Sequence, residues 1–266
     1  MDELNPTQLP GSAIDPQSLD FLRSEPLAPT SVAWAAMREL AIDHKRMTRN
    51  RIVALERTDP AHLAFDMMRT KVLKSARQDK WATLAITAPT SGCGKSTIAL
   101  NLAISLAKQP DLRVVLMDLD LRHPRLAQIL GHKPQFTTQD FLRAECLIEE
   151  FFVRIGENLA VGASPEAAPH PAELLQDGRT AWSLKRLRQT LRPDIVIYNV
   201  PPLLVSDDCS GFLANVDVAM LVVAAEGSTI SEIDVCERQL SDEAKLLGVV
   251  LNKCRYKAEQ YDNYQA

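Results

Sequence analysis

The sequence predicts an α/β fold: a doubly wound, mostly parallel sheet with helices on both faces. Two observations support this prediction. Short apolar runs rich in Val, Ile and Leu recur from residue 81 onward, and segments with helical spacing of apolar residues separate them. A strand that is apolar along its whole length is buried on both faces, which is typical of parallel strands joined by crossover helices. We expect this domain to cover residues 81–252.

Within this domain the expected strands and helices alternate. The first strand, 83–87, breaks into a glycine-rich loop, and a helix follows that loop as far as Ala107. Two further helices are expected near 179–191 and 229–246. The remaining expected strands are 114–117, 158–161, 195–198, 218–223 and 248–251.

The chain before this domain divides into two parts. Residues 1–30 hold five prolines and five acids against one base, which predicts a disordered acidic tail. Residues 31–80 hold eleven bases against six acids, and we expect a helix over 31–48 and a second from the Asp-Pro pair at 59–60. After the domain, residues 253–266 are expected to form a flexible tail.

The composition excludes several classes of protein. The chain has 266 residues, 46% of them hydrophobic, and a formal net charge of −4, as in ordinary globular proteins. Its longest apolar run, at 216–225, is too short to span a bilayer, and its acidic start is unlike a secretory signal. Five cysteines without a CxxC pair favour reduced thiols over disulfides or a zinc site. The bases of 31–80 alternate with acids, which favours a solvated helix face and no nucleic-acid partner.

The strongest chemical motif lies between the first expected strand and its helix. Glycines in such a loop let backbone N–H groups surround phosphate oxygens, and the helix N-terminus adds partial positive charge. We expect Lys95 to reach the terminal phosphates of a nucleotide and the Ser96 hydroxyl to bind Mg²⁺. Pro89 replaces the first glycine of the usual motif, but the strand–loop–helix setting favours nucleotide binding over a simple glycine turn. The expected phosphate-binding residues are Gly92, Cys93, Gly94, Lys95, Ser96 and Thr97.

Two acids, Asp118 and Asp120, follow the second expected strand directly. Ligands of open α/β sheets bind at the carboxyl ends of the strands. We expect this pair to hold metal-bound water or to accept a proton from an attacking hydroxyl group. The alternative is that these acids only cap the next helix, and the nearby phosphate loop favours the catalytic role.

Asn199 ends the strand in which P-loop enzymes normally place an acid that supports Mg²⁺. An amide can hydrogen-bond a water on the metal but cannot supply negative charge. We therefore expect Asn199 to act through water and to weaken phosphoryl transfer. Asp207 or Asp208 could supply the missing charge, although loop acids more often face solvent.

These motifs resemble those of the bacterial tyrosine kinases (BY-kinases) of capsule and exopolysaccharide synthesis, the CpsD/CapB-like P-loop proteins. The resemblance covers roughly residues 81–256 and includes the loop at 91–97, the MDLDLRHP stretch at 117–124 and the two prolines at 201–202. It implies a P-loop NTPase fold of the MinD/ParA type with ATP and Mg²⁺ as cofactors.

The same resemblance implies roles for two further residues. Arg122 is expected to act with Lys95 on the γ-phosphate. Asn252, at the end of the last strand, is expected to recognise the base, and the absence of an NKxD motif there argues against guanine.

Three of the four tyrosines lie in the last eleven residues of the chain. The resemblance implies that this cluster accepts phosphate in trans within a ring of subunits, with Tyr256, Tyr261 and Tyr264 as acceptors. The ring-forming ExxRxxR helix of the family is represented here by residues 63–69, which keep only Arg69. A homo-oligomeric ring, a dimer and a monomer all stay open.

Three functions follow as hypotheses. The leading one is an ATP-dependent protein-tyrosine autokinase that regulates the synthesis or export of exopolysaccharide or capsular polysaccharide. The second is an ATP-binding switch that binds a membrane polysaccharide co-polymerase without phosphorylating it, which Asn199 and the degenerate ring helix favour. The third, a ParA/MinD-type positioning ATPase, is disfavoured because Thr90 stands where those proteins have a second lysine.

The resemblance also implies a partner and a location. The expected partner is a separate membrane polysaccharide co-polymerase that activates the kinase. The chain is then expected to be cytoplasmic and to reach the inner face of the bacterial plasma membrane through that partner.

Overall fold

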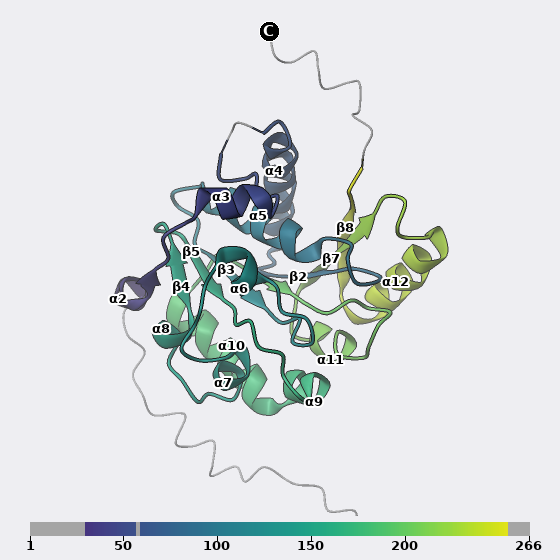
Figure 1. Cartoon of the computed structure of the whole chain (residues 1–266). Coiled ribbons are helices and arrows are strands. Elements are labelled where there is room, and N and C mark those ends of the chain that lie inside the picture. Colours follow the sequence, from purple (N-terminus) through teal and green to yellow (C-terminus); the bar gives the residue numbers. More distant parts are fainter. Residues whose placement is uncertain (1–29, 57–58, 255–266) are drawn as a thin grey trace, which may run out of the picture.

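An eight-stranded sheet organises residues 30–56 and 59–254, the part of the chain that the computed structural model describes (Figure 1). Its strands are β1 (Arg38–Glu39), β2 (Thr83–Thr87), β3 (Val114–Asp118), β4 (Val153–Ile155), β5 (Leu159–Gly162), β6 (Ile195–Asn199), β7 (Val218–Ala224) and β8 (Lys245–Asn252). The strand order is β1-β4-β5-β3-β6-β2-β7-β8. Neighbouring strands are parallel except for β4 and β5. The predicted doubly wound, mostly parallel fold is therefore confirmed.

Helices cover both faces of this sheet. In the described part of the chain they are α2 (Thr30–Ala36), α3 (His44–Arg49), α4 (His62–Asp79), α5 (Lys95–Ala107), α6 (Leu126–Leu130), α7 (Thr138–Leu142), α8 (Ile148–Phe151), α9 (Pro171–Gln176), α10 (Gly178–Leu191), α11 (Ser210–Leu213) and α12 (Ile230–Glu243). Side chains of α3, α4, α5 and α6 form one apolar core with one face of the sheet. Side chains of α2 and of α7 to α12 form a second core on the other face.

The central strands β2, β3, β6 and β7 are buried along their whole length. Successive side chains of a strand point to opposite faces, so Leu84 and Ile86 join the first core and Ala85 joins the second. Because both faces need apolar side chains, these strands appear in the sequence as continuous apolar runs. Their parallel arrangement brings the carboxyl ends of all four to one edge of the sheet.

The expected single helix over 31–48 is wrong. The structure has α2, the short strand β1 and then α3, because this segment passes around the edge of the sheet from one core to the other. Trp34 is buried in the second core and Met47 in the first, which one straight helix could not achieve. The Trp34 ring nitrogen donates to the Leu191 carbonyl oxygen at 2.8 Å, and Asp43 caps α3 by accepting from the Arg46 N–H.

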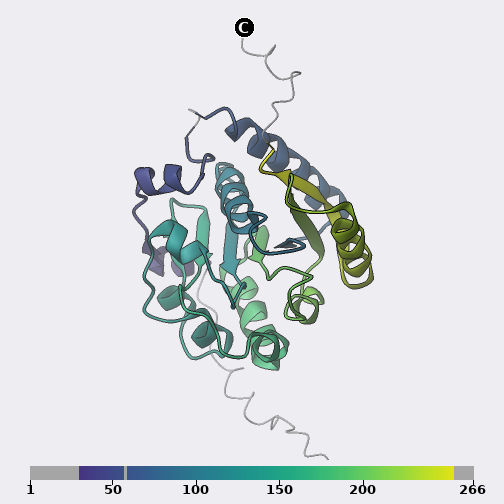
Figure 2. The same ribbon diagram turned by 45° about the vertical axis from the view of Figure 1, so that its right-hand side comes forward.

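The second expected N-terminal helix is confirmed as α4. Phe65 and Val72 are its buried residues, and they belong to the core that α5 shares. In both views α4 runs alongside the edge strand β8, where Lys245 Nζ lies 2.9 Å from Asp79 Oδ2 (Figures 1 and 2). Residues before the phosphate loop are thus part of the same packed structure as the sheet.

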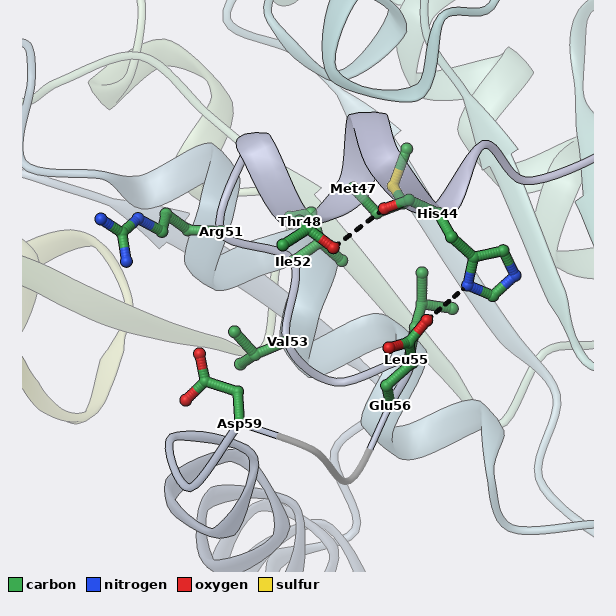
Figure 3. Close-up of a pocket in the computed structure, with 9 residues that line it drawn as sticks. All are labelled: His44, Met47, Thr48, Arg51, Ile52, Val53, Leu55, Glu56 and Asp59. Atoms are coloured by element: carbon green, nitrogen blue, oxygen red, sulfur yellow. Dashed lines mark hydrogen bonds and ion pairs between the residues drawn. The ribbon is translucent and has the colours of Figure 1, made fainter.

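The segment between α3 and α4 turns back under α3 (Figure 3). His44 and Glu56 approach each other across this turn, with Nδ1 and Oε1 2.7 Å apart. Asn101 of α5 stabilises the turn, because its Oδ1 accepts from the N–H groups of Val53 and Ala54 at 2.8 and 2.9 Å. The turn therefore depends on one buried amide of the helix that follows the phosphate loop.

Other bounds differ modestly from expectation. The helix expected over 229–246 ends at Glu243, and β8 begins at Lys245 rather than at 248. The helix expected near 179–191 is confirmed as α10. The short elements β4, α6 to α9 and α11 were not predicted, because three to six residues are too few to show a period. Within residues 30–56 and 59–254, no helix combines the length and apolar character needed to cross a membrane.

Candidate functional site

The phosphate loop joins β2 to the N-terminus of α5, as the motif predicts. Gly92 and Gly94 have φ angles of +86° and +95°, a region that L side chains rarely adopt. At Gly94 a Cβ would also collide with the side-chain nitrogen of Asn252. Lys95, Ser96 and Thr97 form the first turn of α5, whose leading N–H groups have no carbonyl partner within the helix. The loop thus offers N–H donors and a helix N-terminus to an anion.

Lys95 and Asp120 form a buried ion pair. The Lys95 ammonium donates to Oδ2 of Asp120, and both side chains are at most 10% exposed. Oδ1 of Asp120 accepts from the His123 N–H at 3.2 Å. The lysine that is expected to bind phosphate is therefore neutralised by one of the two expected acids.

Asp118 is buried where β3 ends, and its two oxygens have different partners. Oδ2 accepts from the N–H groups of Arg125 and Leu126 at 2.9 Å, so it caps α6. Oδ1 accepts from Nδ2 of Asn199 at 2.7 Å. Burial raises the pKa of Asp118. The helix-cap and catalytic roles considered for this acid are compatible, because only one oxygen serves the helix.

Asn199 lies between the phosphate loop and Asp118. Its Nδ2 donates to Ser96 Oγ at 3.2 Å as well as to Asp118, while its Oδ1 is buried and accepts no hydrogen bond within the described part of the chain. A buried acceptor without a donor is costly, so this oxygen calls for a donor that a nucleotide complex would bring, such as metal-bound water.

The donor set suits Mg²⁺. The hydroxyl of Ser96 and the carboxylate of Asp118 share Asn199 as a neighbour, and Asp120 follows two residues later. Mg²⁺ is usually held by one or two carboxylates together with substrate phosphates and waters, which is what these groups and a bound nucleotide would supply. Within residues 30–56 and 59–254, no three His, Cys, Asp or Glu side chains form a metal site by themselves, so the Mg²⁺ site would be completed by Ser96 and the nucleotide phosphates.

Arg122 points to Asp208. Its Nε and Nη2 donate to the two oxygens of the Asp208 carboxylate, the second at 2.9 Å, and Asp208 is fully buried. Of the two acids expected as substitutes for a third-motif acid, Asp207 is exposed and Asp208 is paired with Arg122. The sequence does not reveal this pairing, because the two residues are 86 positions apart.

The last strand returns to the phosphate loop. Nδ2 of Asn252 donates to the Cys93 carbonyl oxygen at 2.8 Å, so the expected base-recognition residue contacts the loop itself. The three expected acceptor tyrosines, Tyr256, Tyr261 and Tyr264, lie outside the described residues.

Comparison with known families agrees with this site. The family described as the CobQ/CobB/MinD/ParA nucleotide binding domain matches residues 84–266. The chain belongs to this family. Nucleotide binding is therefore a property of the family to which this chain belongs.

Proteins named as tyrosine-protein kinases are among the relatives of this chain. The tyrosine-protein kinase CpsD of Streptococcus pneumoniae serotype 4 is 28% identical over 186 residues, 69% of this chain and 81% of CpsD. The tyrosine-protein kinase YwqD of Bacillus subtilis is 29% identical over 224 residues, 82% of this chain and 92% of YwqD. EpsB of Ralstonia solanacearum is 32% identical over 200 residues, and there the chain spans only 26% of the relative. The expected resemblance to bacterial tyrosine kinases is confirmed.

Solved structures share the fold. The kinase domain of the Escherichia coli tyrosine kinase ETK superposes with a TM-score of 0.66 at 22% identity, covering 75% of this chain and 80% of the solved domain. The chimerical protein CapA2B2 superposes with a TM-score of 0.68 at 23% identity, covering 90% of this chain and 98% of the chimera. MinD of Pyrococcus horikoshii is more distant, with a TM-score of 0.53 at 21% identity over 64% of this chain and 69% of MinD. The expected P-loop fold of the MinD/ParA type is confirmed.

Proposed function

We propose that this chain is an ATP-dependent protein-tyrosine kinase that phosphorylates tyrosines of its own C-terminal segment and regulates exopolysaccharide or capsular polysaccharide synthesis. One observation carries the proposal: Asp118 and Asp120 lie beside the phosphate loop and are connected to its residues Ser96 and Lys95. Asp120 is paired with Lys95, and Asp118 is linked to Ser96 through Asn199. The names of CpsD and YwqD support the choice of tyrosine as acceptor.

The residues divide the work of phosphoryl transfer among them. The N–H groups of the loop and Lys95 would bind the nucleotide phosphates. Ser96 and Asp118 would hold Mg²⁺ directly, and Asp120 and Asn199 would contact it through water. Bound Mg²⁺ supplies positive charge against the phosphate oxygens. Transfer of this kind depends mainly on positioning and electrostatics, so this small set of groups is sufficient.

Asp120 is the proposed proton acceptor. In the structure its carboxylate is neutralised by Lys95. Nucleotide phosphates compete for the same ammonium, so binding frees the Asp120 carboxylate to take the proton of a tyrosine hydroxyl. The tyrosine oxygen then bonds to the γ-phosphorus, the bond from that phosphorus to the β-phosphate oxygen breaks, and ADP leaves.

The position of β8 supports the C-terminal tyrosines as acceptors. Asn252 hydrogen-bonds to Cys93, so the chain leaves the sheet beside the phosphate loop. Tyr256 follows only four residues later, and four residues span at most about 14 Å.

The test is mass spectrometry of the full chain after incubation with ATP and Mg²⁺. We expect phosphate on at least one of Tyr256, Tyr261 and Tyr264, and none in Lys95→Met. Lys108→Met, an exposed position just after α5, is the matched control and should leave labelling unchanged. Equal labelling of wild type and Lys95→Met would contradict the proposal. Mixing Lys95→Met with an active chain that lacks the three tyrosines shows whether transfer occurs between subunits.

Asn199 is the one observation behind a second candidate function, which the names of the relatives do not favour. The amide cannot supply the negative charge that P-loop enzymes place here, so the chain could bind ATP and a membrane polysaccharide co-polymerase without phosphorylating it. A pull-down with the cytoplasmic segment of such a partner tests this function. Capture that depends on nucleotide, with no phosphotyrosine formed when the partner is present, would support the switch over the kinase. Under either function we place the chain at the inner face of the plasma membrane through that partner.

A further inference from the structure

The Arg122–Asp208 ion pair joins two loops that leave neighbouring strands. Arg122 follows β3, and Asp208 lies between β6 and α11. Both oxygens of the Asp208 carboxylate accept from the Arg122 guanidinium, and Ser206 Oγ adds a hydrogen bond of 2.9 Å. The paired contact is the fork geometry that arginine provides and lysine does not.

Burial makes this pair hard to break. The Asp208 side chain is 0% exposed, whereas the Arg122 side chain is 44% exposed. Turning Arg122 toward a nucleotide would leave a buried carboxylate without its cation, which is strongly destabilising. The hydrogen bond that Arg122 donates to Asp208, with the nearby charges of Asp207 and Glu173, raises the pKa of Arg122 and keeps it charged.

The same two loops begin directly after the groups on the metal side of the site, because Asp118 ends β3 and Asn199 ends β6. The Leu119 N–H donates to the Asn199 carbonyl oxygen at 2.8 Å, and Asn199 Nδ2 lies 2.7 Å from Asp118 Oδ1. The ion pair adds a link beyond the ends of the two strands, between the loops themselves. Loss of this link would let the loops separate just beyond Asp118 and Asn199.

We infer that Asp208 is a positioning residue: through Arg122 it fixes the spacing of the loops that follow Asp118 and Asn199 and so steadies these two strand ends, and it holds Arg122 away from the phosphates. This role differs from the direct contact with the γ-phosphate that the family resemblance implies for Arg122. It depends on nucleotide binding, which belongs to the family, and not on the proposed kinase activity.

The test is calorimetric measurement of ADP binding by the full chain, with and without Mg²⁺. The quantity of interest is the factor by which Mg²⁺ tightens ADP binding. We expect Asp208→Asn and Arg122→Ala each to lower this factor about tenfold, as losses of residues behind metal ligands do. The double variant should lose no more than either single variant, because both changes remove one link. Asp207→Asn, the same change at the exposed neighbour, should stay within about twofold.

A direct phosphate role for Arg122 predicts different results. In a parallel titration with a non-hydrolysable ATP analogue, Asp208→Asn would then free the guanidinium and tighten binding, and Arg122→Ala would weaken it even without Mg²⁺. Either result, or additive losses in the double variant, would overturn the inference. Asp208→Glu keeps the charge and should recover part of the Mg²⁺ factor. Melting temperatures are measured in parallel, and a lower value with an unchanged Mg²⁺ factor would also contradict a positioning role. Absent tyrosine labelling with an intact Mg²⁺ factor would count against the kinase proposal alone.

Discussion

Nδ2 of Asn199 lies 2.7 Å from Oδ1 of Asp118, and both side chains are buried. The amide therefore places a hydrogen-bond donor against an acid whose pKa burial already raises. A carboxylate at position 199 would instead place a second negative charge there. This contact explains how the chain tolerates a buried Asp118 without a nucleotide.

Asn199→Asp should lower stability at neutral pH and raise tyrosine labelling. Two buried carboxylates in contact raise each other's pKa, at a cost of roughly 2 kcal/mol when both are ionised. Because the pKa values of both acids are raised in the folded state, the repulsion is absent at low pH, where the acids are protonated. It appears, and stability is lost, as pH rises and both acids ionise. The deficit relative to wild type should be largest at pH 7–8 and shrink near pH 4, as measured by urea unfolding. ADP with Mg²⁺, but not ADP alone, should restore the lost stability, and a deficit independent of pH would contradict this account.

Gly94→Ala should be more harmful than Gly92→Ala. Both glycines have positive φ angles, of +95° and +86°, but only at Gly94 would a Cβ meet another group, the Asn252 amide. Gly92→Ala should cost about 1 kcal/mol for its backbone conformation alone, and Gly94→Ala should cost more and weaken ADP binding. Adding Asn252→Ala should remove the difference between the two variants. Equal unfolding free energies for the two single variants would refute the collision.

Asn101→Ala should release the turn between α3 and α4. The buried Asn101 amide accepts from the Val53 and Ala54 N–H groups and donates to the carbonyl oxygens of Arg51 and Thr97. Leaving these groups without partners should cost about 2–4 kcal/mol by urea unfolding. Amide exchange at Val53 and Ala54 should accelerate well before global unfolding. Asn50→Ala is the control. The Asn50 side chain donates a hydrogen bond to the Arg46 carbonyl oxygen at the end of α3, and its loss should cost less than about 1 kcal/mol.

Cys254 should be the first of the five thiols to react with alkylating reagents at pH 8. Cys254 is exposed. Burial raises the pKa values of Cys146 and Cys209 to about 12 and that of Cys236 to about 11, so few of these thiols are ionised. Peptide mapping after short exposure to iodoacetamide should find Cys254 modified, and Cys254→Ser should remove the fast phase. Rapid modification of Cys209 in the folded chain would contradict the burial described for it.

The predicted fold is accurate where burial dictates the sequence. β2, β3 and β6 are buried throughout and mostly apolar because helices cover both of their faces, so their bounds follow closely from composition. The segment 31–48 misleads because its apolar residues serve two different cores. Trp34 and Met47 lie on opposite faces of the sheet. The spacing of apolar residues along the sequence does not show that the chain crosses from one face to the other between them. The two-residue strand β1 exists only through its pairing with β4.

The site is predictable to the extent that its residues are adjacent in sequence. The glycine-rich loop and the Asp118–Asp120 pair are local motifs, and the structure brings both to one edge of the sheet. The partners of Arg122 and Asn252 depend on strand order, which no local motif encodes. Asp208 in particular is expected to face solvent because it lies in a loop, but it is buried and paired with Arg122.

The path of the N-terminal segment around the sheet edge has a consequence for how the protein is made. Trp34 bonds to Leu191, 157 residues later, and Arg38 pairs with Val153. During synthesis these residues emerge long before α10 and β4 exist, and closing such long loops is slow. The first described residues to leave the ribosome therefore reach their native contacts only after more than half of the chain has been made.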